Sequence, residues 1–166
     1  LDADCRVKKD WLKSVIDFYT ANNAKLILGP VTYIHNYKFF NIIQGLEFMS
    51  LSASAAGSAG IKRSVLSNAA NMAFEKSLIN ELEDPFGEKY TSGDDIFLLQ
   101  NTKQKYKDKI FFIRDKNAMV YTYPASSLKS FFRQRTRWTS KSFGYKDNDL
   151  LTVSLIILVL NVTLLI

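Results

Sequence analysis

The hydrophobic and polar residues of this chain follow two patterns, one typical of strands and one typical of helices, and these patterns predict its elements. Residues 25–34 are apolar and β-branched around Gly29-Pro30, which predicts a strand with a bend. Residues 39–54 carry apolar side chains at helical spacing and predict a helix. The small residues 55–60 (AAGSAG) that follow predict a flexible loop.

The middle of the chain continues this interleaving. Residues 64–74 predict a short strand followed by a turn, and residues 75–82 predict a helix that stops before Pro85. A helix is expected from Asp94 to residue 106, because acidic side chains in a first turn interact favourably with the helix dipole. Residues 110–113 and 118–123 predict two strands. Strands that alternate with helices indicate an α/β fold.

The C-terminal part has a different pattern. Ser126 or Ser127 predicts the cap of a helix that runs to about residue 143, and residues 145–149 form a polar hinge. The apolar run 150–166 has seventeen residues, about 25 Å as a helix, against a bilayer core of about 30 Å. We therefore expect a transmembrane helix over 149–166 that lacks its last turn. A buried core helix is the alternative, although such helices usually carry polar breaks.

Charge and cysteine content restrict the classes of partner. The chain is 47% hydrophobic and 23% charged with a net charge of +6, which favours an anionic partner. Because the positive residues gather beside the apolar run and no recognition motif appears, we expect no nucleic-acid partner. The single cysteine, Cys5, excludes an internal disulfide.

The first candidate motif is Asp2-Ala3-Asp4. In an extended segment, residues two apart face the same side, so both carboxylates would converge on one point. That arrangement suits a hard divalent cation, Mg²⁺ or Mn²⁺, which in turn binds a diphosphate. The alternative is a solvated acid pair near a chain end.

The second candidate motif is Gly93-Asp94-Asp95. Attack by a hydroxyl group requires a base that takes its proton, and a carboxylate at a helix N-terminus is held in place to do so. The alternative is an ordinary pair of first-turn charges.

The third candidate motif places Gln134, Arg137 and Trp138 at positions i, i+3 and i+4 of a helix, where they share a face. Arg137 can bind phosphate oxygens, Trp138 offers a flat apolar ring for stacking, and Gln134 can donate and accept hydrogen bonds. Alternatively, Trp138 is a membrane-interface anchor on a basic amphipathic helix that binds anionic lipid through Lys129, Arg133, Arg135 and Lys141.

In this order, the three motifs resemble the catalytic half of a membrane-bound family 2 glycosyltransferase, a family related to cellulose, chitin and hyaluronan synthases and to ceramide glucosyltransferase. The resemblance covers nearly the whole chain. It implies part of a GT-A domain with a mixed sheet over residues 1–125, an interfacial helix over 126–146 and the membrane helix over 149–166. The chain begins without Met and ends inside an apolar run, so we expect an upstream half to be missing and this piece alone to be inactive.

The resemblance also implies roles for single residues. It assigns metal binding mainly to Asp4 with Asp2 nearer the nucleotide, and the general base to Asp95 with Asp94 as a supporting acid. Arg137 would bind the diphosphate, while Gln134 and Trp138 would border the acceptor. Residues 67–74 resemble the family's Gly-Ala-Asn-x-Ala-Tyr segment, with Ala69 in place of Gly and Phe74 in place of Tyr, and this implies an acceptor-side contact by Asn71. Glu47 has a counterpart near the acceptor in some relatives, and no role is assigned to it.

The implied activity is inverting, metal-dependent transfer from a nucleotide sugar, with a UDP-hexose favoured, to a polysaccharide or lipid acceptor. The cofactor is Mg²⁺ or Mn²⁺. The positive-inside rule, applied to Lys141 and Lys146, places the catalytic side in the cytosol of a multi-pass protein of the cell membrane, in contact with membrane lipid. A non-enzymatic, membrane-anchored basic module is the alternative of another class.

Overall fold

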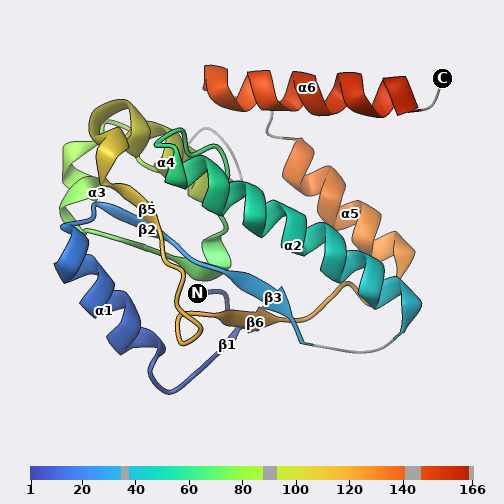
Figure 1. Ribbon diagram of the computed structural model, residues 1–166, viewed down its shortest axis with the longest axis horizontal. Coiled ribbons are helices and arrows are strands. Elements are labelled where there is room, and N and C mark those ends of the chain that lie inside the picture. The colour runs from blue at the N-terminus through green and yellow to red at the C-terminus, as the bar shows by residue number, and fades with distance from the viewer. Residues whose placement is uncertain (35–37, 88–92, 141–146, 165–166) are drawn as a thin grey trace.

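The computed structural model describes residues 1–34, 38–87, 93–140 and 147–164, and within them strands and helices interleave as predicted (Figure 1). The described strands form two three-stranded mixed sheets. In the first sheet, β6 (Val120–Thr122) lies between β1 (Arg6–Val7), which is antiparallel to it, and β3 (Val31–Tyr33), which is parallel. In the second, β2 (Leu26–Leu28) lies between antiparallel β4 (Met72–Phe74) and parallel β5 (Ile110–Phe112). Mixed sheets of this kind fit a partial GT-A domain.

The two sheets are joined because the same two chain segments, paired in parallel, contribute one strand each to both sheets. The strand predicted over 25–34 divides at Gly29-Pro30 into β2 and β3, which confirms the predicted bend. Its partner segment also divides, into β5 and β6, which are separated by the connection 113–119. Backbone bonds continue across the division, since Ile113 N donates to Leu28 O at 2.9 Å and Val120 N donates to Pro30 O at 3.0 Å.

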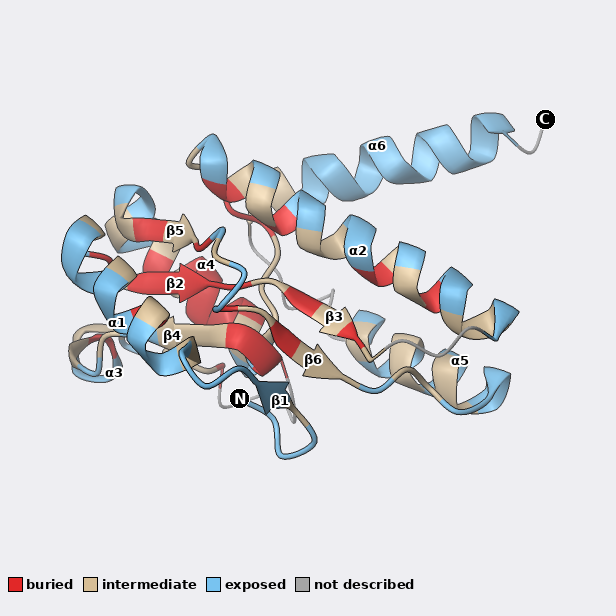
Figure 2. Ribbon diagram, turned by 60° about the horizontal axis from the view of Figure 1, so that its bottom comes forward, coloured by how far each residue is buried: buried red, intermediate tan, exposed pale blue. Residues whose placement is uncertain are grey.

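Helices cover both faces of the second sheet. Side chains along a strand point alternately to opposite faces. Ile27 packs with Val15 of α1 (Trp11–Asn22) on one face. Leu26 and Leu28 pack with α4 (Asp94–Tyr106) on the other. The whole of β2 is therefore buried (Figure 2).

The long helix α2 (Phe39–Gly60) corrects one prediction. The helix predicted over 39–54 is present, but the loop predicted over 55–60 is wrong, because the helix continues through these residues. Glycine in a helix costs about 1 kcal/mol relative to alanine. Here the small side chains permit close packing, and Ala55 and Ala59 are buried.

The segment before β4 has its elements in the reverse of the predicted order. A short 3-10 turn, η1 (Ala69–Asn71), precedes β4, whereas a strand followed by a turn was predicted over 64–74. The helix predicted over 75–82 is confirmed as α3 (Ser77–Glu81). A second 3-10 turn, η2 (Lys107–Lys109), joins α4 to β5.

Helix α5 (Leu128–Thr139) begins at Ser127, as predicted, in a capping box with Ser130. The N–H of Ser130 donates to Ser127 Oγ at 3.2 Å, and the N–H of Ser127 donates to Ser130 Oγ at 3.0 Å. The predicted helix end near residue 143 lies outside the described residues.

Helix α6 (Asn148–Leu164) lies above α2 and α5 in Figure 1, and residues 151–164 are exposed. Its first turn is tied to the domain, because Lys103 Nζ lies 2.7 Å from carboxylate oxygens of both Asp147 and Asp149. α6 has 17 residues, and no helix in the described ranges has both the length and the apolar character to cross a membrane. The transmembrane helix predicted over 149–166 is thus not confirmed.

Candidate functional site

The three motifs lie around one apolar cluster, here called the motif cluster, whose buried members are Val31, Tyr33, Phe48, Ala70 and Val120. Cys5, directly after Asp4, packs against it, and so does Trp138 of the third motif. Ala70 follows Ala69, whose N–H donates to Asp95. The fold therefore brings segments from both ends and the middle of the chain to one place.

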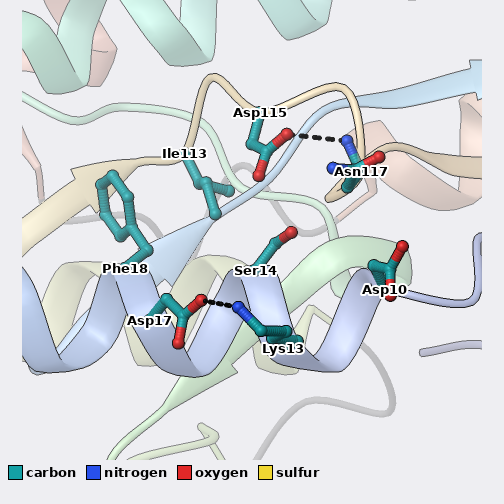
Figure 3. A pocket seen from close by; sticks show the side chains of 8 residues that line it. All are labelled: Asp10, Lys13, Ser14, Asp17, Phe18, Ile113, Asp115 and Asn117. Carbon is teal, nitrogen blue, oxygen red and sulfur yellow. Dashed lines mark hydrogen bonds and ion pairs between the residues drawn. The ribbon is translucent and has the colours of Figure 1, made fainter.

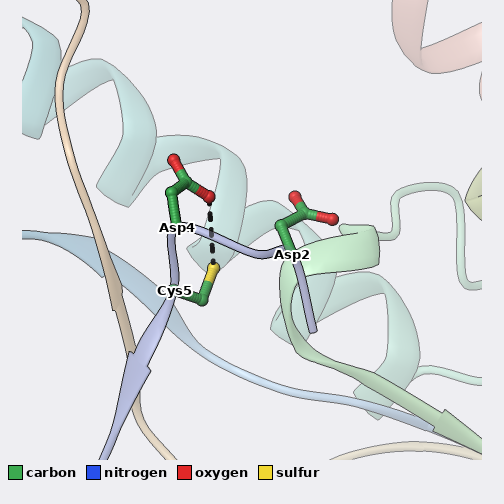
Figure 4. A group of neighbouring side chains, drawn as sticks. All are labelled: Asp2, Asp4 and Cys5. Carbon is green, nitrogen blue, oxygen red and sulfur yellow. Dashed lines mark hydrogen bonds between the residues drawn. The ribbon is translucent and has the colours of Figure 1, made fainter.

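The acid pair Asp2 and Asp4 lies in a turn, not in the extended segment that was predicted. The N–H of Cys5 donates to the carbonyl of Asp2 at 3.1 Å and closes this turn. Both carboxylates still lie close together (Figure 4), and one ligand atom from each of Asp2, Asp4 and Cys5 lies within 4.8 Å of the others. Asp4 Oδ2 also accepts a hydrogen bond from Thr122 Oγ1 of β6 at 3.3 Å.

The chemistry of this group suits an oxygen-binding cation through two of its three members. Carboxylate oxygens are the ligands that Mg²⁺ and Mn²⁺ prefer. Burial raises the pKa of the Cys5 thiol, which its hydrogen bond to the Asp2 backbone only partly offsets. The protonated thiol points toward Asp4 Oδ1 at 4.0 Å. Asp2 and Asp4, and not Cys5, are therefore the candidate ligands.

The second motif opens α4, as predicted. Its cap, Gly93, has φ +107°, a left-handed conformation that favours glycine. Asp94 is exposed and Asp95 is half-buried. Asp95 Oδ2 accepts from the backbone N–H of Ala69 at 3.2 Å. This bond and the positive end of the helix dipole hold the Asp95 carboxylate beside the motif cluster.

Asn71 is buried where the two sheets divide. Its Nδ2 donates to the carbonyls of Pro30 and Ala118, both at 2.8 Å, and its Oδ1 accepts from Trp11 Nε1 at 3.3 Å. A Cβ atom on Gly29 would lie 2.4 Å from Asn71 Nδ2, so only glycine leaves room for this amide. Asn71 thus joins the strands, and its predicted acceptor contact stays a prediction.

The third motif lies on α5 with its side chains in different surroundings. Gln134 and Trp138 are half-buried, and Trp138 packs against the motif cluster. Arg137 is exposed, and its side chain has no hydrogen bond or ion pair within the described part of the chain. Arg137 is therefore placed to bind an anion from solvent, while Gln134 and Trp138 line the inner side.

Arg135 is the residue whose surroundings the sequence interpretation missed. Only the alternative interpretation gave it a place, on a basic, lipid-facing surface, whereas in the structure it forms a two-bonded ion pair with Glu47 of α2. A signal was available in the sequence, because Glu47 is the one charged residue among the 22 of α2. A single charged side chain on an otherwise uncharged, partly buried helix predicts an ion pair with an oppositely charged residue.

A pocket of about 540 Å³ lies away from the motifs, between α1 and the β5–β6 connection (Figure 3). Its polar side chains are largely engaged with their neighbours. Lys13 Nζ pairs with Asp17 at 2.7 Å, and Asp115 accepts from the N–H of Asn117 at 2.8 Å. None of the predicted site residues lines this pocket.

Comparison with known proteins identifies the family of the chain. The family model described as glycosyl transferase family group 2 matches residues 1–165. No curated protein matches the chain. Because the family model covers almost the whole sequence, the chain belongs to glycosyl transferase family group 2.

Proposed function

We propose that this chain transfers a sugar from a nucleoside diphosphate donor, with a UDP-hexose favoured, to a hydroxyl group of a glycan or lipid acceptor, with inversion at the sugar carbon. Family membership supports glycosyl transfer in general. The observation that carries the finer proposal is the convergence of the acid pair, Asp95 and Trp138 around the motif cluster.

Asp95 acts as the general base. The acceptor oxygen attacks the sugar carbon, its proton passes to the Asp95 carboxylate, and the bond from the sugar to the diphosphate breaks. The N–H of Ala69 holds this carboxylate at 3.2 Å, which limits its motion relative to the acceptor. Asp94, exposed beside it, adds negative charge at the same helix end.

The departing diphosphate needs positive charge. Arg137 supplies charge-assisted hydrogen bonds to its oxygens, which suits an exposed guanidinium with no partner in the described part of the chain. Asp2 and Asp4 would hold a Mg²⁺ or Mn²⁺ ion. When bound, such an ion stabilises negative charge on the leaving group.

The acceptor lies on the side of Gln134 and Trp138. The Trp138 indole offers a flat apolar surface for a sugar ring, and the Gln134 amide can bind hydroxyl groups. The acceptor-side contact predicted for Asn71 belongs to this proposal, and Asn71 also fixes the segment that holds Asp95.

The site works at the cytosolic face of the cell membrane in this proposal. Residues 151–164 of α6 are largely apolar and exposed, which supports contact with lipid. The exposed basic residues Lys129, Arg133 and Arg137 of α5 would interact with anionic headgroups or substrate phosphates.

The test is nucleoside diphosphate release by the full-length protein in membranes. A panel of UDP- and GDP-sugars is supplied with lipid extract as acceptor, with and without EDTA, and Asp95→Asn is measured in parallel. Release from one donor, lost with chelator and with the variant, supports the proposal. No release from any donor would refute it and favour the non-enzymatic, lipid-binding module.

A further inference from the structure

Helix α2 is fixed against the start of α5 by contacts on its inner side. The Phe40 and Phe131 rings meet edge to face at 5.9 Å. Gln44 exchanges two hydrogen bonds with the backbone of Ala125, at 2.9 and 3.1 Å. Glu47 lies one turn further along the same helix. The position of its carboxylate relative to α5 is therefore set by the fold.

The Glu47 carboxylate binds Arg135 with two parallel bonds. Arg135 Nε donates to Glu47 Oε1 at 2.7 Å, and Arg135 Nη2 donates to Glu47 Oε2. The two side chains are only 17% and 35% exposed for Arg135 and Glu47, so water competes weakly for the pair. A two-bonded pair fixes the plane of the guanidinium as well as its position.

The fixed guanidinium in turn orients two residues of the third motif. Its remaining nitrogen, Nη1, donates to Gln134 Oε1 at 2.7 Å, which directs the Gln134 amide hydrogens away from it. Its carbon Cζ lies 4.2 Å from the centre of the Trp138 ring and 4.5 Å from that of Phe131. The cation thus holds the Trp138 ring against the motif cluster.

We propose that Glu47 and Arg135 are positioning residues, which hold Gln134 and Trp138 in the orientation that receives the acceptor. This inference rests on the proposed function. Arg135 and Arg137, which lie within the segment 134–138, then have different roles. Arg135 faces inward and organises the site, whereas Arg137 faces solvent and binds the diphosphate.

The first test is Glu47→Gln in the full-length protein. The change keeps the side-chain volume and removes the charge that holds Arg135. We expect kcat to fall about 10–100-fold and the acceptor KM to rise, because small displacements of substrate-contacting groups have effects of this size. The donor KM should stay within about twofold, since Arg137 is unchanged. An unchanged kcat would overturn the inference.

The matched control is Glu75→Gln. Glu75 pairs with Lys25 at 3.0 Å and has a side-chain exposure of 28%, close to that of Glu47, but it lies beside the second sheet, away from the motifs. It loses the same kind of charge in a similar environment. Its kcat should match that of the wild type.

A charge swap separates positioning from simple stabilisation. Glu47→Arg combined with Arg135→Glu restores opposite charges between α2 and α5, but a glutamate at 135 cannot donate to Gln134 or act as a cation on Trp138. We expect the thermal midpoint of the double variant to lie above those of the two single variants and closer to the wild-type value, while its kcat stays low. Recovery of kcat with the swap would leave only a structural role for the pair.

A readout without substrate keeps this inference separate from the proposed function. With 5-fluorotryptophan incorporated, the fluorine resonance of Trp138, assigned by Trp138→Phe, should shift in Glu47→Gln and stay in place in Glu75→Gln. If the wild type releases no diphosphate from any donor, the proposed function fails. The resonance then still decides whether Glu47 positions Trp138, and an unmoved resonance refutes that.

Discussion

The two sheets of this domain differ in packing and in what they carry. The second sheet has helices on both faces and a fully buried central strand. The predicted site residues lie outside the described strands of both sheets. The first sheet has an exposed edge, since both residues of β1 lie open to solvent. Asp4 accepts a hydrogen bond from Thr122 of this sheet, and Trp138 packs against the motif cluster, to which the sheet contributes Val31, Tyr33 and Val120. The well-packed part supports the open part, where substrate-binding side chains can remain accessible.

Asn71 stands between these two regions. At the division it donates to backbone carbonyls of both paired segments, Pro30 and Ala118, and the N–H of nearby Ala69 donates to Asp95. The comparison therefore predicts three kinds of outcome. Changes beside the first sheet, and at Asp95 at the start of α4, should affect activity. Changes in the packed interior of the second sheet should affect stability, and changes at Asn71 should affect both.

The largest effect is expected from Asp95→Asn. Loss of a general base typically lowers the rate about 10²–10⁴-fold. The new amide oxygen can still accept from the N–H of Ala69, so the free energy of unfolding should fall only by about 0.3–1 kcal/mol, through the lost interaction with the helix dipole. Diphosphate release and urea unfolding of the same preparation measure both quantities. A large loss of stability would mean that Asp95 is structural.

The next effect, on stability, is expected from Leu98→Ala. Leu98 is fully buried between α4 and β2, and such truncations cost about 2–5 kcal/mol of unfolding free energy. Leu12→Ala is the control, because the Leu12 side chain is exposed on α1, and it should cost under about 0.5 kcal/mol of unfolding free energy. Urea unfolding gives the values. The kcat per folded molecule should not change, and a fall in it would break the division between the two regions.

Asn71→Ala sharpens the comparison. It removes the hydrogen bonds of the Asn71 amide to the Ala118 carbonyl and to the Trp11 indole at a buried site, whereas the Pro30 carbonyl keeps its bond from Val120 N. Loss of such partners costs about 1–3 kcal/mol. Asn22→Ala removes a single side-chain hydrogen bond, to the Phe18 carbonyl, and should cost less unfolding free energy. Because residues 69–71 also hold Asp95, we expect kcat to fall in the first variant only. Equal kcat in both variants would mean that the two regions are independent.

The smallest effect concerns acid stability of the second region. Hydrogen bonds from Tyr106 and Ser77, with support from Lys25, lower the pKa of Glu81 from 4.5 to about 2. A lowered folded-state pKa contributes stability that is present above pH 4.5 and is lost as pH falls toward 2. Glu81→Gln should flatten the fall of the thermal midpoint across this window and leave kcat at neutral pH unchanged. An unaltered slope would show that Glu81 does not contribute.

Local patterns predicted most elements because their causes are local. Gly29-Pro30 marked the bend, Ser127 the start of α5, and Asp94 the start of α4. The same rules were wrong for residues 55–60, since Gly, Ala and Ser are weak helix signals. Their helical state depends on close packing that small side chains allow, which involves residues distant in the sequence.

The sequence by itself determined the family, the order of the motifs and the spacing of Gln134, Arg137 and Trp138 on one helix. Only the tertiary structure decided what each polar group binds. It turned Arg135 inward to Glu47 and left Arg137 in solvent, and it buried the Asn71 amide between the sheets. Helical neighbours three and four apart are fixed by backbone geometry. Contacts between side chains of distant elements depend instead on how those elements pack. An ion pair or a hydrogen bond of a side-chain amide forms only where packing brings both partners together.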